Sequence, residues 1–166
     1  MHESADDLAQ LQQVLDDSYQ VAGAHIKSIH TEERRLSAAD MCAELNGACI
    51  LDLATVSASH APYVAPVDGL FVRGRFWFCS DPDSLRFRHI RRNHTVSAAY
   101  TRGETLSILV HGIAHEVDTG TGEFDYVREY CLEVYGESYA DWGFWGRYPY
   151  AWIEPKRMFA GWMPTP

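Results

Sequence analysis

Five short segments between residues 48 and 117 constrain the fold of this chain most strongly. They are rich in β-branched, aromatic and small apolar residues, and turns or one helical segment separate them. The predicted strands are residues 49–56, 63–67, 76–80, 96–101 and 106–117. Hairpin links between strands favour an antiparallel barrel over a doubly wound parallel sheet. A last strand at residues 150–155 is expected to close the sheet.

Helical spacing and capping signals predict four helices around these strands. Apolar residues at helical spacing predict an amphipathic helix over residues 5–26. Ser37 followed by Asp40 predicts a capping box, and the helix that it opens is expected to end at Asn46–Gly47. The two remaining predicted helices are residues 81–92, with a proline in the first turn, and residues 121–135.

The predicted elements and the composition together indicate one structural domain. A chain of 166 residues, 46% of them hydrophobic, can bury one continuous core. We expect a mainly β fold with flanking helices, in which a helical arm of residues 1–47 packs on a barrel of residues 48–166.

Charge and hydropathy exclude several classes of partner and location. The formal net charge of −9 disfavours nucleic acid and anionic membranes, so we expect neither as a partner. The apolar runs are far shorter than the roughly 20 residues of a membrane span, and no apolar segment follows the acidic N-terminus as in a secretory signal. We therefore expect a cytoplasmic protein, in which the four widely spaced cysteines are reduced thiols.

The run from Phe76 to Arg92 places the end of a predicted strand directly before a basic helix. Ser80 lies at the strand end, and Ser84 and Arg86 lie at the helix start. Free backbone N–H groups, two hydroxyls and a forked guanidinium are donors that suit a phosphate. The alternative is that Arg86 and the three arginines after it only solvate an exposed helix face. Spacing alone leaves both interpretations open.

Seven short blocks, taken in order, resemble one known family. They are LATV (53–56), PYVAPV (62–67), RFWF (75–78), SLR (84–86), IRRN (90–93), VS (96–97) and HGIA (111–114). No single block is specific, but their ordered set resembles the pyridoxamine 5'-phosphate oxidase-like split β-barrels over about residues 48 to 118. The helix after residue 122, with Ala140-Asp141-Trp142, is similar to the branch that contains deazaflavin-dependent reductases.

The resemblance implies a cofactor site and an assembly. In that family a hydroxyl residue at the end of the third strand and a basic residue early in the next helix hold the flavin phosphate. These roles fall on Ser80 and Arg86, with Ser84 close by. The ring system lies along the second strand, here near Ala65-Pro66-Val67, and a second protomer covers its other face. The resemblance therefore implies a homodimer with FMN, or a deazaflavin as the alternative.

The sequence departs from the family pattern at several positions. Arg86 stands where lysine is usual, which keeps the charge, and His94 stands where proline is usual. His60-Ala61 replaces the common hairpin glycine. Asp68 follows the ring-contacting segment, and a carboxylate there would disfavour an electron-rich reduced flavin unless it pointed away.

Other candidate residues favour structural roles. His111 and His115 would share one face of a strand but lie about 13 Å apart at a rise of ~3.3 Å per residue, too far to bind one metal. Asp52, inside an apolar strand, is either a buried functional carboxylate or, as the commoner case and our expectation, a residue that faces the helix layer with a hydrogen-bond partner. The aromatic residues of the C-terminal segment have two about equally supported roles: they line a substrate pocket, or they complete a core or a dimer interface. They are Trp142, Phe144, Trp145, Tyr148 and Trp152.

These observations lead to two functional hypotheses. The first is an FMN-dependent or deazaflavin-dependent oxidoreductase on a small-molecule substrate, in which the cofactor carries the hydride or electron chemistry, so no catalytic residue is nominated. The second is a flavin-binding or flavin-storing protein without turnover, or a dimeric module without cofactor. The sequence has no Gly-x-Ser-x-Gly elbow, P-loop or Gly-x-Gly-x-x-Gly motif, which argues against hydrolase, NTPase and Rossmann classes.

Overall fold

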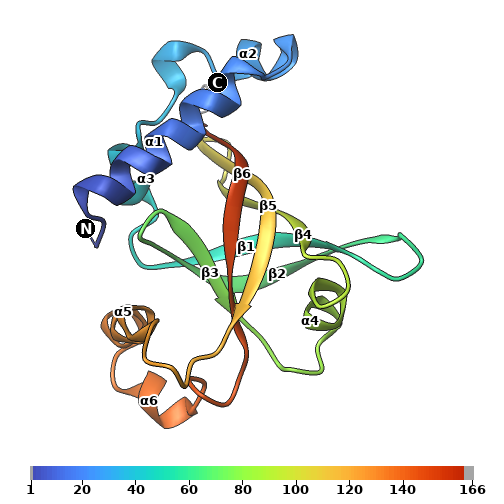
Figure 1. Ribbon diagram of the computed structural model, residues 1–166. Coiled ribbons are helices and arrows are strands. Elements are labelled where there is room, and N and C mark those ends of the chain that lie inside the picture. The colour runs from blue at the N-terminus through green and yellow to red at the C-terminus, as the bar shows by residue number, and fades with distance from the viewer. Residues whose placement is uncertain (1, 163–166) are drawn as a thin grey trace.

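The computed structural model describes residues 2–162 and contains a closed, six-stranded antiparallel β-barrel (Figure 1). The strand order around the barrel is β1-β2-β3-β6-β5-β4. The strands are β1 (Ala48–Val56), β2 (Pro62–Val72), β3 (Arg75–Cys79), β4 (Thr95–Arg102), β5 (Leu106–Val117) and β6 (Tyr150–Trp162). The predicted antiparallel barrel with flanking helices is thus confirmed.

Two groups of helices flank opposite ends of the barrel. Helices α1 to α3 lie around one end, α5 and α6 lie at the other, and α4 connects β3 to β4 at the side (Figure 1). The helices are α1 (Ala5–Gln20), α2 (Ala24–Ile29), the 3₁₀ turn η1 (Glu32–Arg34), α3 (Ala38–Glu44), α4 (Leu85–Ile90), α5 (Asp125–Tyr135) and α6 (Ser138–Trp142).

The hairpins form where the sequence predicts them. β1 and β2 pair antiparallel from Ala48 with Leu70 to Val56 with Pro62. His60, at the position of the common hairpin glycine, adopts a positive φ of 63°. It therefore takes the left-handed conformation that a glycine would take without steric cost. The capping box of Ser37 is also present, as predicted.

Three predicted helices have different bounds in the structure. The segment 5–26 is interrupted because Val21 ends α1 and the extended backbone of Gly23 begins α2. The basic helix begins at Leu85 rather than residue 81, because Asp81–Asp83 forms a turn in which the Asp83 N–H donates to Asp81 Oδ1 at 2.8 Å. The last predicted helix starts four residues late, at Asp125.

Strand β2 is paired on both edges along only part of its length. Gly69–Val72 pairs with β3, whereas Pro62–Leu70 pairs with β1. Within the described residues, the second edge of residues 62–68 therefore has no partner strand. This unpaired edge positions the site described below.

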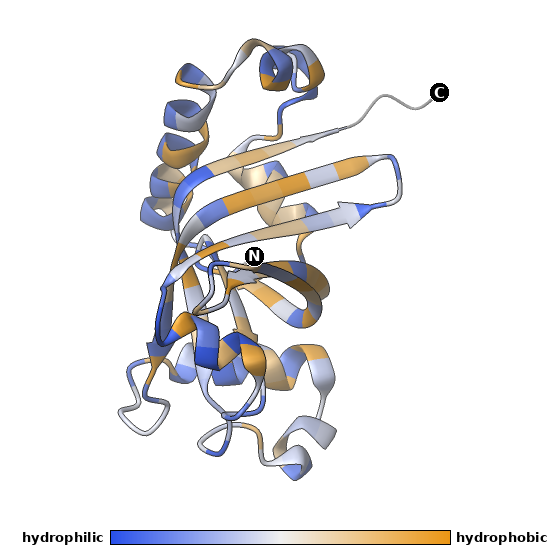
Figure 2. Ribbon diagram, turned by 90° about the vertical axis from the view of Figure 1, so that its right-hand side faces the viewer, coloured by the Kyte–Doolittle hydropathy of each residue, from blue (hydrophilic) through white to orange (hydrophobic). Residues whose placement is uncertain are grey.

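The barrel interior and the N-terminal helices share one hydrophobic core. Leu15 of α1 and Met41 of α3 belong to the same buried cluster as Leu51, Phe76 and Val110 of the barrel. Figure 2 shows hydrophobic residues recurring along the barrel strands. A second cluster lies outside β3, under α5 and α6, and is mostly aromatic. The N-terminal helices thus complete the core at one end of the barrel.

Gly112 provides a test of the packing between β5 and β6. It lies at a register shift beside His111, and a Cβ there would meet the Glu154 carbonyl oxygen far inside van der Waals contact. We expect Gly112→Ala to lower the free energy of unfolding by roughly 1–3 kcal/mol, since neither backbone can move freely. Gly23→Ala is the control, because open space surrounds Gly23. Urea denaturation measures the stability of both variants. Equal stabilities would contradict the close packing of Gly112 against the Glu154 backbone.

Candidate functional site

A cavity of about 580 Å³ lies where the open edge of β2 meets the end of β3 and the start of α4. Its wall combines apolar, aromatic, hydroxyl and charged side chains from segments far apart in the sequence. The lining residues are Ile50, Pro66, Val67, Asp68, Cys79, Ser80, Asp81, Arg86, Phe144 and Tyr148.

Arg86 is the cation in this wall, and two hydrogen bonds fix its guanidinium. Nη1 donates to Ser80 Oγ at 3.2 Å, and Nη2 donates to the Pro66 carbonyl oxygen at 2.9 Å. The second bond uses a carbonyl of β2 beyond its pairing with β3. Arg86 therefore joins α4, the end of β3 and β2. A guanidinium has five N–H donors, and the donors that these two bonds do not use remain for a ligand.

The electrostatics of the cavity are mixed. Partial burial lowers the pKa of the Arg86 guanidinium, while the nearby Cys79 and Asp68 groups oppose this shift. Arginine remains charged at neutral pH despite such a shift. Asp68 and Asp81 add two carboxylates to the same wall. The cavity thus offers one fixed, directed cation within an otherwise acidic surrounding.

The structure brings four of the six predicted binding residues together. Pro66, Val67, Ser80 and Arg86 all line the cavity, although Val67 is mostly covered. Ser84 does not line it, since its side chain caps α4 and its Oγ accepts from the Phe87 N–H at 3.4 Å. The capping role explains why a serine stands there.

Ala65 also lies outside the lining residues, next to Pro66 on the exposed part of β2. Sequence reasoning did not assign Ile50, Cys79 or Asp81 to the site. Ile50 was not identifiable, because only the register of β1 against β2 sets it opposite Asp68. Asp81 was identifiable, since it directly follows the strand end at Ser80.

The aromatic tail divides between the two expected roles. Phe144 and Tyr148 line the cavity. Trp145 and Trp152 pack against the aromatic cluster outside β3. Trp142 is 45% exposed and packs at 5.5 Å, between ring centroids, against Phe144. The pocket and the core interpretations therefore each hold for part of this segment.

The other arginines of the basic helix differ from Arg86. Arg91 forms a two-bonded ion pair with Glu116, at 2.7 and 2.9 Å, and also donates to the Pro82 carbonyl oxygen. Arg88 and Arg92 are exposed and line a separate surface hollow. The solvated-face interpretation fits these residues, whereas Arg86 alone reaches the cavity.

The remaining candidates have structural surroundings. His111 Nδ1 lies 2.8 Å from Ser97 Oγ, and His115 Nε2 lies 2.9 Å from Glu154. Asp52 is exposed, so the expectation of a hydrogen-bonded carboxylate beside the helix layer is wrong. Within residues 2–162, no group of three or more His, Cys, Asp or Glu side chains is arranged to hold a metal ion. Nor does any helix in this part of the chain have the length and apolarity needed to cross a membrane.

Comparisons with known proteins identify the fold. No protein-family model and no curated protein matches the chain. The conserved hypothetical protein Rv2991 of Mycobacterium tuberculosis superimposes with a TM-score of 0.65 and 16% identity, covering 80% of this chain and 88% of that one. An FAD-binding protein of Mesorhizobium loti superimposes with a TM-score of 0.60 and 20% identity, covering 80% of this chain and 97% of that one. HutZ, the heme storage protein of Vibrio cholerae, superimposes with a TM-score of 0.61 and 16% identity, covering 73% of this chain and 90% of that one.

An F420 reductase and a Listeria innocua protein provisionally assigned as a pyridoxamine 5'-phosphate oxidase share this architecture. The protein therefore has the split β-barrel fold of the pyridoxamine 5'-phosphate oxidase-like proteins, as the sequence blocks predicted. At these identities the comparisons establish the fold, and the site must be interpreted from its own residues.

The buried thiols generate a pH prediction. Burial raises the pKa of the Cys49 thiol to about 12 and that of Cys131 to about 11. Both thiols stay protonated near pH 9 in the folded state, whereas in the unfolded chain they lose their protons near pH 9. Their contribution to the free energy of unfolding is therefore full below pH 9 and falls above it. Between pH 9 and 10 we expect a loss of roughly 1.4 kcal/mol per thiol per pH unit at most.

Denaturation at pH 8, 9 and 10 measures this loss. The Cys49→Ser/Cys131→Ser variant is the control, because serine does not ionise in this range. Its stability should fall less steeply with pH than that of the wild type, and parallel slopes would contradict the prediction.

Proposed function

We propose that the cavity binds FMN and that the protein is an oxidoreductase acting on a small-molecule substrate. The observation that carries the proposal is the guanidinium of Arg86, held by Ser80 and the Pro66 carbonyl at the wall of a cofactor-sized cavity. A cavity of about 580 Å³ falls within the ~300–1,000 Å³ usual for small-molecule and cofactor sites.

The phosphate would bind at the Arg86 end of the cavity. A guanidinium fork binds two phosphate oxygens at once, and fixing the fork beforehand reduces the entropy lost on binding. The Ser80 hydroxyl is positioned beside it, 3.2 Å from Nη1. This pairing supports the roles that the family resemblance implies for the two residues.

The ring system would lie along Pro66 and Val67, with Ala65 at its edge. This part of β2 has an open edge, and Phe144 and Tyr148 face the same cavity with aromatic side chains. A bound flavin supplies hydride or electron transfer. The residues of this chain bind and orient it, and none is proposed as a catalytic acid or base.

Asp68 is the observation that favours testing a second cofactor. Asp68 lies in the cavity wall, and its carboxylate would disfavour an electron-rich reduced flavin unless it points away from the ring. A deazaflavin-dependent reductase on the same fold is therefore the alternative, and the neighbours include an F420 reductase. Equilibrium titration of the apoprotein with FMN and with a phosphate-bearing deazaflavin ranks the two, and tighter binding of the deazaflavin would reverse our order.

Turnover separates an oxidoreductase from a flavin-storage protein. The absorption spectrum of the purified protein shows whether it carries a flavin band, and stopped-flow bleaching and recovery of that band with candidate donors show whether the cofactor cycles. A band that no donor changes would support storage. The proposal places the protein in the cytoplasm, with residues 1–47 as an arm of the single domain that residues 48–166 form.

The phosphate assignment is tested by two arginine substitutions on one helix. Arg86→Ala removes a charge-assisted pair worth about 1.5–3 kcal/mol and should weaken FMN binding about ten-fold to more than a hundred-fold. Arg92→Ala is the matched control, since Arg92 is exposed and does not line the cavity. Fluorescence titration at low and moderate salt measures both. Equal, strongly salt-dependent losses would mean that only the general basic field matters.

We further propose a homodimer that covers the open side of the cavity. Ile50 and Val64 form an apolar flank on one face of β1 and β2, with exposures of 54% and 66%. A partner there would bury this flank and the second face of the ring.

Val64→Glu is therefore expected to shift sedimentation velocity from dimer toward monomer and to weaken FMN binding. Val21→Glu is the matched control, because Val21 is 64% exposed but lies beyond the end of α1. A wild-type monomer at micromolar concentration would count against both the dimer and the bound-flavin proposal.

A further inference from the structure

A surface hollow of about 540 Å³, here named the outer hollow, lies between α4 and the tip of the β1–β2 hairpin. Figure 1 shows this hairpin extending past α4 on one side of the barrel. Arg88 and Arg92 line the hollow from α4 and its end, and Ser57 and Ser59 line it from the hairpin. The outer hollow shares no lining residue with the proposed cofactor cavity, which therefore does not account for it.

Two arginines bring unpaired positive charge to the outer hollow. Arg88 and Arg92 are exposed, and neither guanidinium forms an ion pair within residues 2–162. A third lining arginine, Arg91, is already held by Glu116 and the Pro82 carbonyl oxygen. In the part of the chain that the structure describes, no carboxylate lines this hollow, although the net charge of the chain is −9. A local positive field of this kind attracts an anion.

Arg88 and Arg92 are spaced to bind one anion together. The last turn of α4 continues past Arg91, since the Arg92 N–H donates to the His89 carbonyl oxygen at 3.0 Å. Residues four apart on a helix lie on the same side, with about 5–6 Å between their Cβ atoms. Each guanidinium fork can donate to two phosphate oxygens, and two forks match the charge of about −1.5 to −2 on a phosphate monoester.

The hairpin wall supplies a hydroxyl donor. Ser57 Oγ and Ser59 Oγ lie 3.0 Å apart, and the Ala61 N–H donates to Ser57 Oγ at 3.1 Å. The bond between the two serines uses one of their two hydroxyl hydrogens, so the other remains for a ligand. An acceptor in the hollow therefore finds donors on both walls.

His89 adds a nearly buried polar group to the wall. It lines the outer hollow although it is only 7% exposed, and its Nδ1 lies 2.9 Å from Thr55 Oγ1. Its Nε2 has no partner within residues 2–162, and Trp77 Nε1 is the one sealed side-chain nitrogen or oxygen without a partner in that range. The Nε2 of His89 is therefore accessible, and Thr55 holds the ring that carries it.

Leu85 places an apolar surface beside the cations. It lines the same hollow and is 54% exposed. The volume of the hollow exceeds that of a phosphate group and falls within the ~300–1,000 Å³ usual for small-molecule sites. The wall thus suits a phosphate that carries an organic group.

The proposed dimer leaves the outer hollow open. Side chains alternate along a strand, so Thr55 and its register partner Tyr63 lie on the opposite face of the sheet from Ile50 and Val64. The Tyr63 ring lies 5.2 Å from that of His89, between centroids. A partner on the Ile50 face therefore lies across the sheet from the hollow.

We propose that the outer hollow is a second ligand site, which binds a small organic phosphate. The phosphate group takes Arg88, Arg92 and a serine hydroxyl, and the organic group packs on Leu85. This site is separate from the cavity of Arg86, so the proposal does not rest on flavin binding.

The test uses three probes on the ¹⁵N-labelled full-length protein at low salt. Phenyl phosphate has the dianion and an apolar group, inorganic phosphate lacks the apolar group, and benzoate carries a single charge. We expect phenyl phosphate to shift the amide signals of residues 57–59 and 88–92. It should bind roughly 3- to 5-fold more tightly than inorganic phosphate, as covering about 30–40 Å² of apolar surface predicts. Benzoate should bind more weakly than phenyl phosphate.

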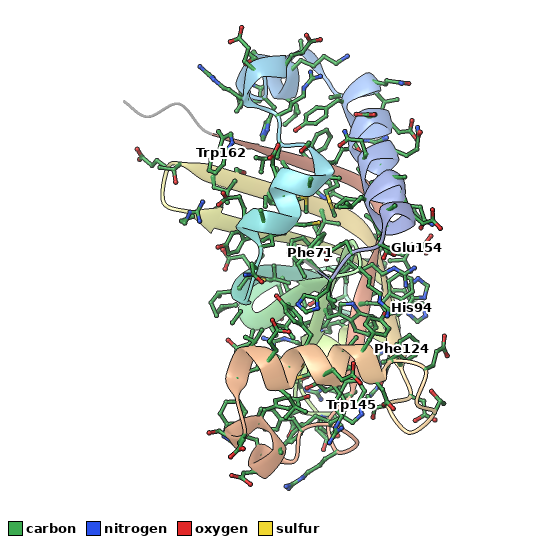
Figure 3. All side chains as sticks on the ribbon, turned by 90° about the vertical axis from the view of Figure 1, so that its left-hand side faces the viewer. Phe71, His94, Phe124, Trp145, Glu154 and Trp162 are labelled. Carbon is green, nitrogen blue, oxygen red and sulfur yellow. The ribbon has the colours of Figure 1, made fainter. Side chains whose placement is uncertain are left out.

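Arginine substitutions test the phosphate contacts. Arg88→Gln and Arg92→Gln should each weaken phenyl phosphate binding roughly 3- to 10-fold, since each removes one charge-assisted pair at an exposed site. Arg128→Gln is the matched control, because it changes the net charge equally and should have little effect. Exposed Arg128 lies on α5, on the opposite side of the strands from α4 (Figure 1), and this helix begins beside Phe124 (Figure 3).

Leu85→Ala tests the organic part of the ligand and should make phenyl phosphate and inorganic phosphate bind about equally. Unmoved signals at residues 57–59 and 88–92, shifts confined to the cavity of Ser80 and Arg86, or equal weakening by Arg128→Gln would each overturn the proposal. FMN should instead shift signals around Ser80 and Arg86. Either site can therefore fail without the other.

Discussion

Closure of the barrel by β6 is the constraint on which the rest of the structure depends. This 13-residue strand pairs with β3 at its start and with β5 along its length. It thereby joins the two sides of the sheet that hairpins alone would leave apart. α1 packs on β6, and the Tyr19 hydroxyl donates to the Ala160 carbonyl at 2.8 Å, which ties the N-terminal arm to the same strand.

The same closure creates the site. Because β3 is short and its start pairs with the end of β2, residues 62–68 keep an open edge. Arg86 bonds to a carbonyl of this stretch and to Ser80. One side chain therefore ties α4 to the unpaired edge of β2 and presents its charge to the cavity.

The two cavities differ in the chemistry that they offer. The larger one has one fixed cation, Arg86, and two carboxylates, Asp68 and Asp81, so the guanidinium is the group in its wall that attracts an anion. A smaller cavity of about 140 Å³ under α5 and α6 is lined mainly by aromatic and apolar side chains, with Asp68 as its charged group. Phe144 lines both cavities, so its orientation affects the space in each.

The sequence by itself determined the strands and the hairpins, because alternation and turn residues are local signals. The strand-to-helix junction and the family resemblance led to Ser80 and Arg86, which the structure places in one cavity wall. The predicted start of α4 was wrong, and Ser84, nominated as a binding residue, caps α4 and does not line the cavity. Only the tertiary structure decided that Ile50 and Phe144 meet at one cavity and that Trp77 lies buried under α5. Strand register and helix packing bring these residues together, and no local pattern encodes contacts across such separations.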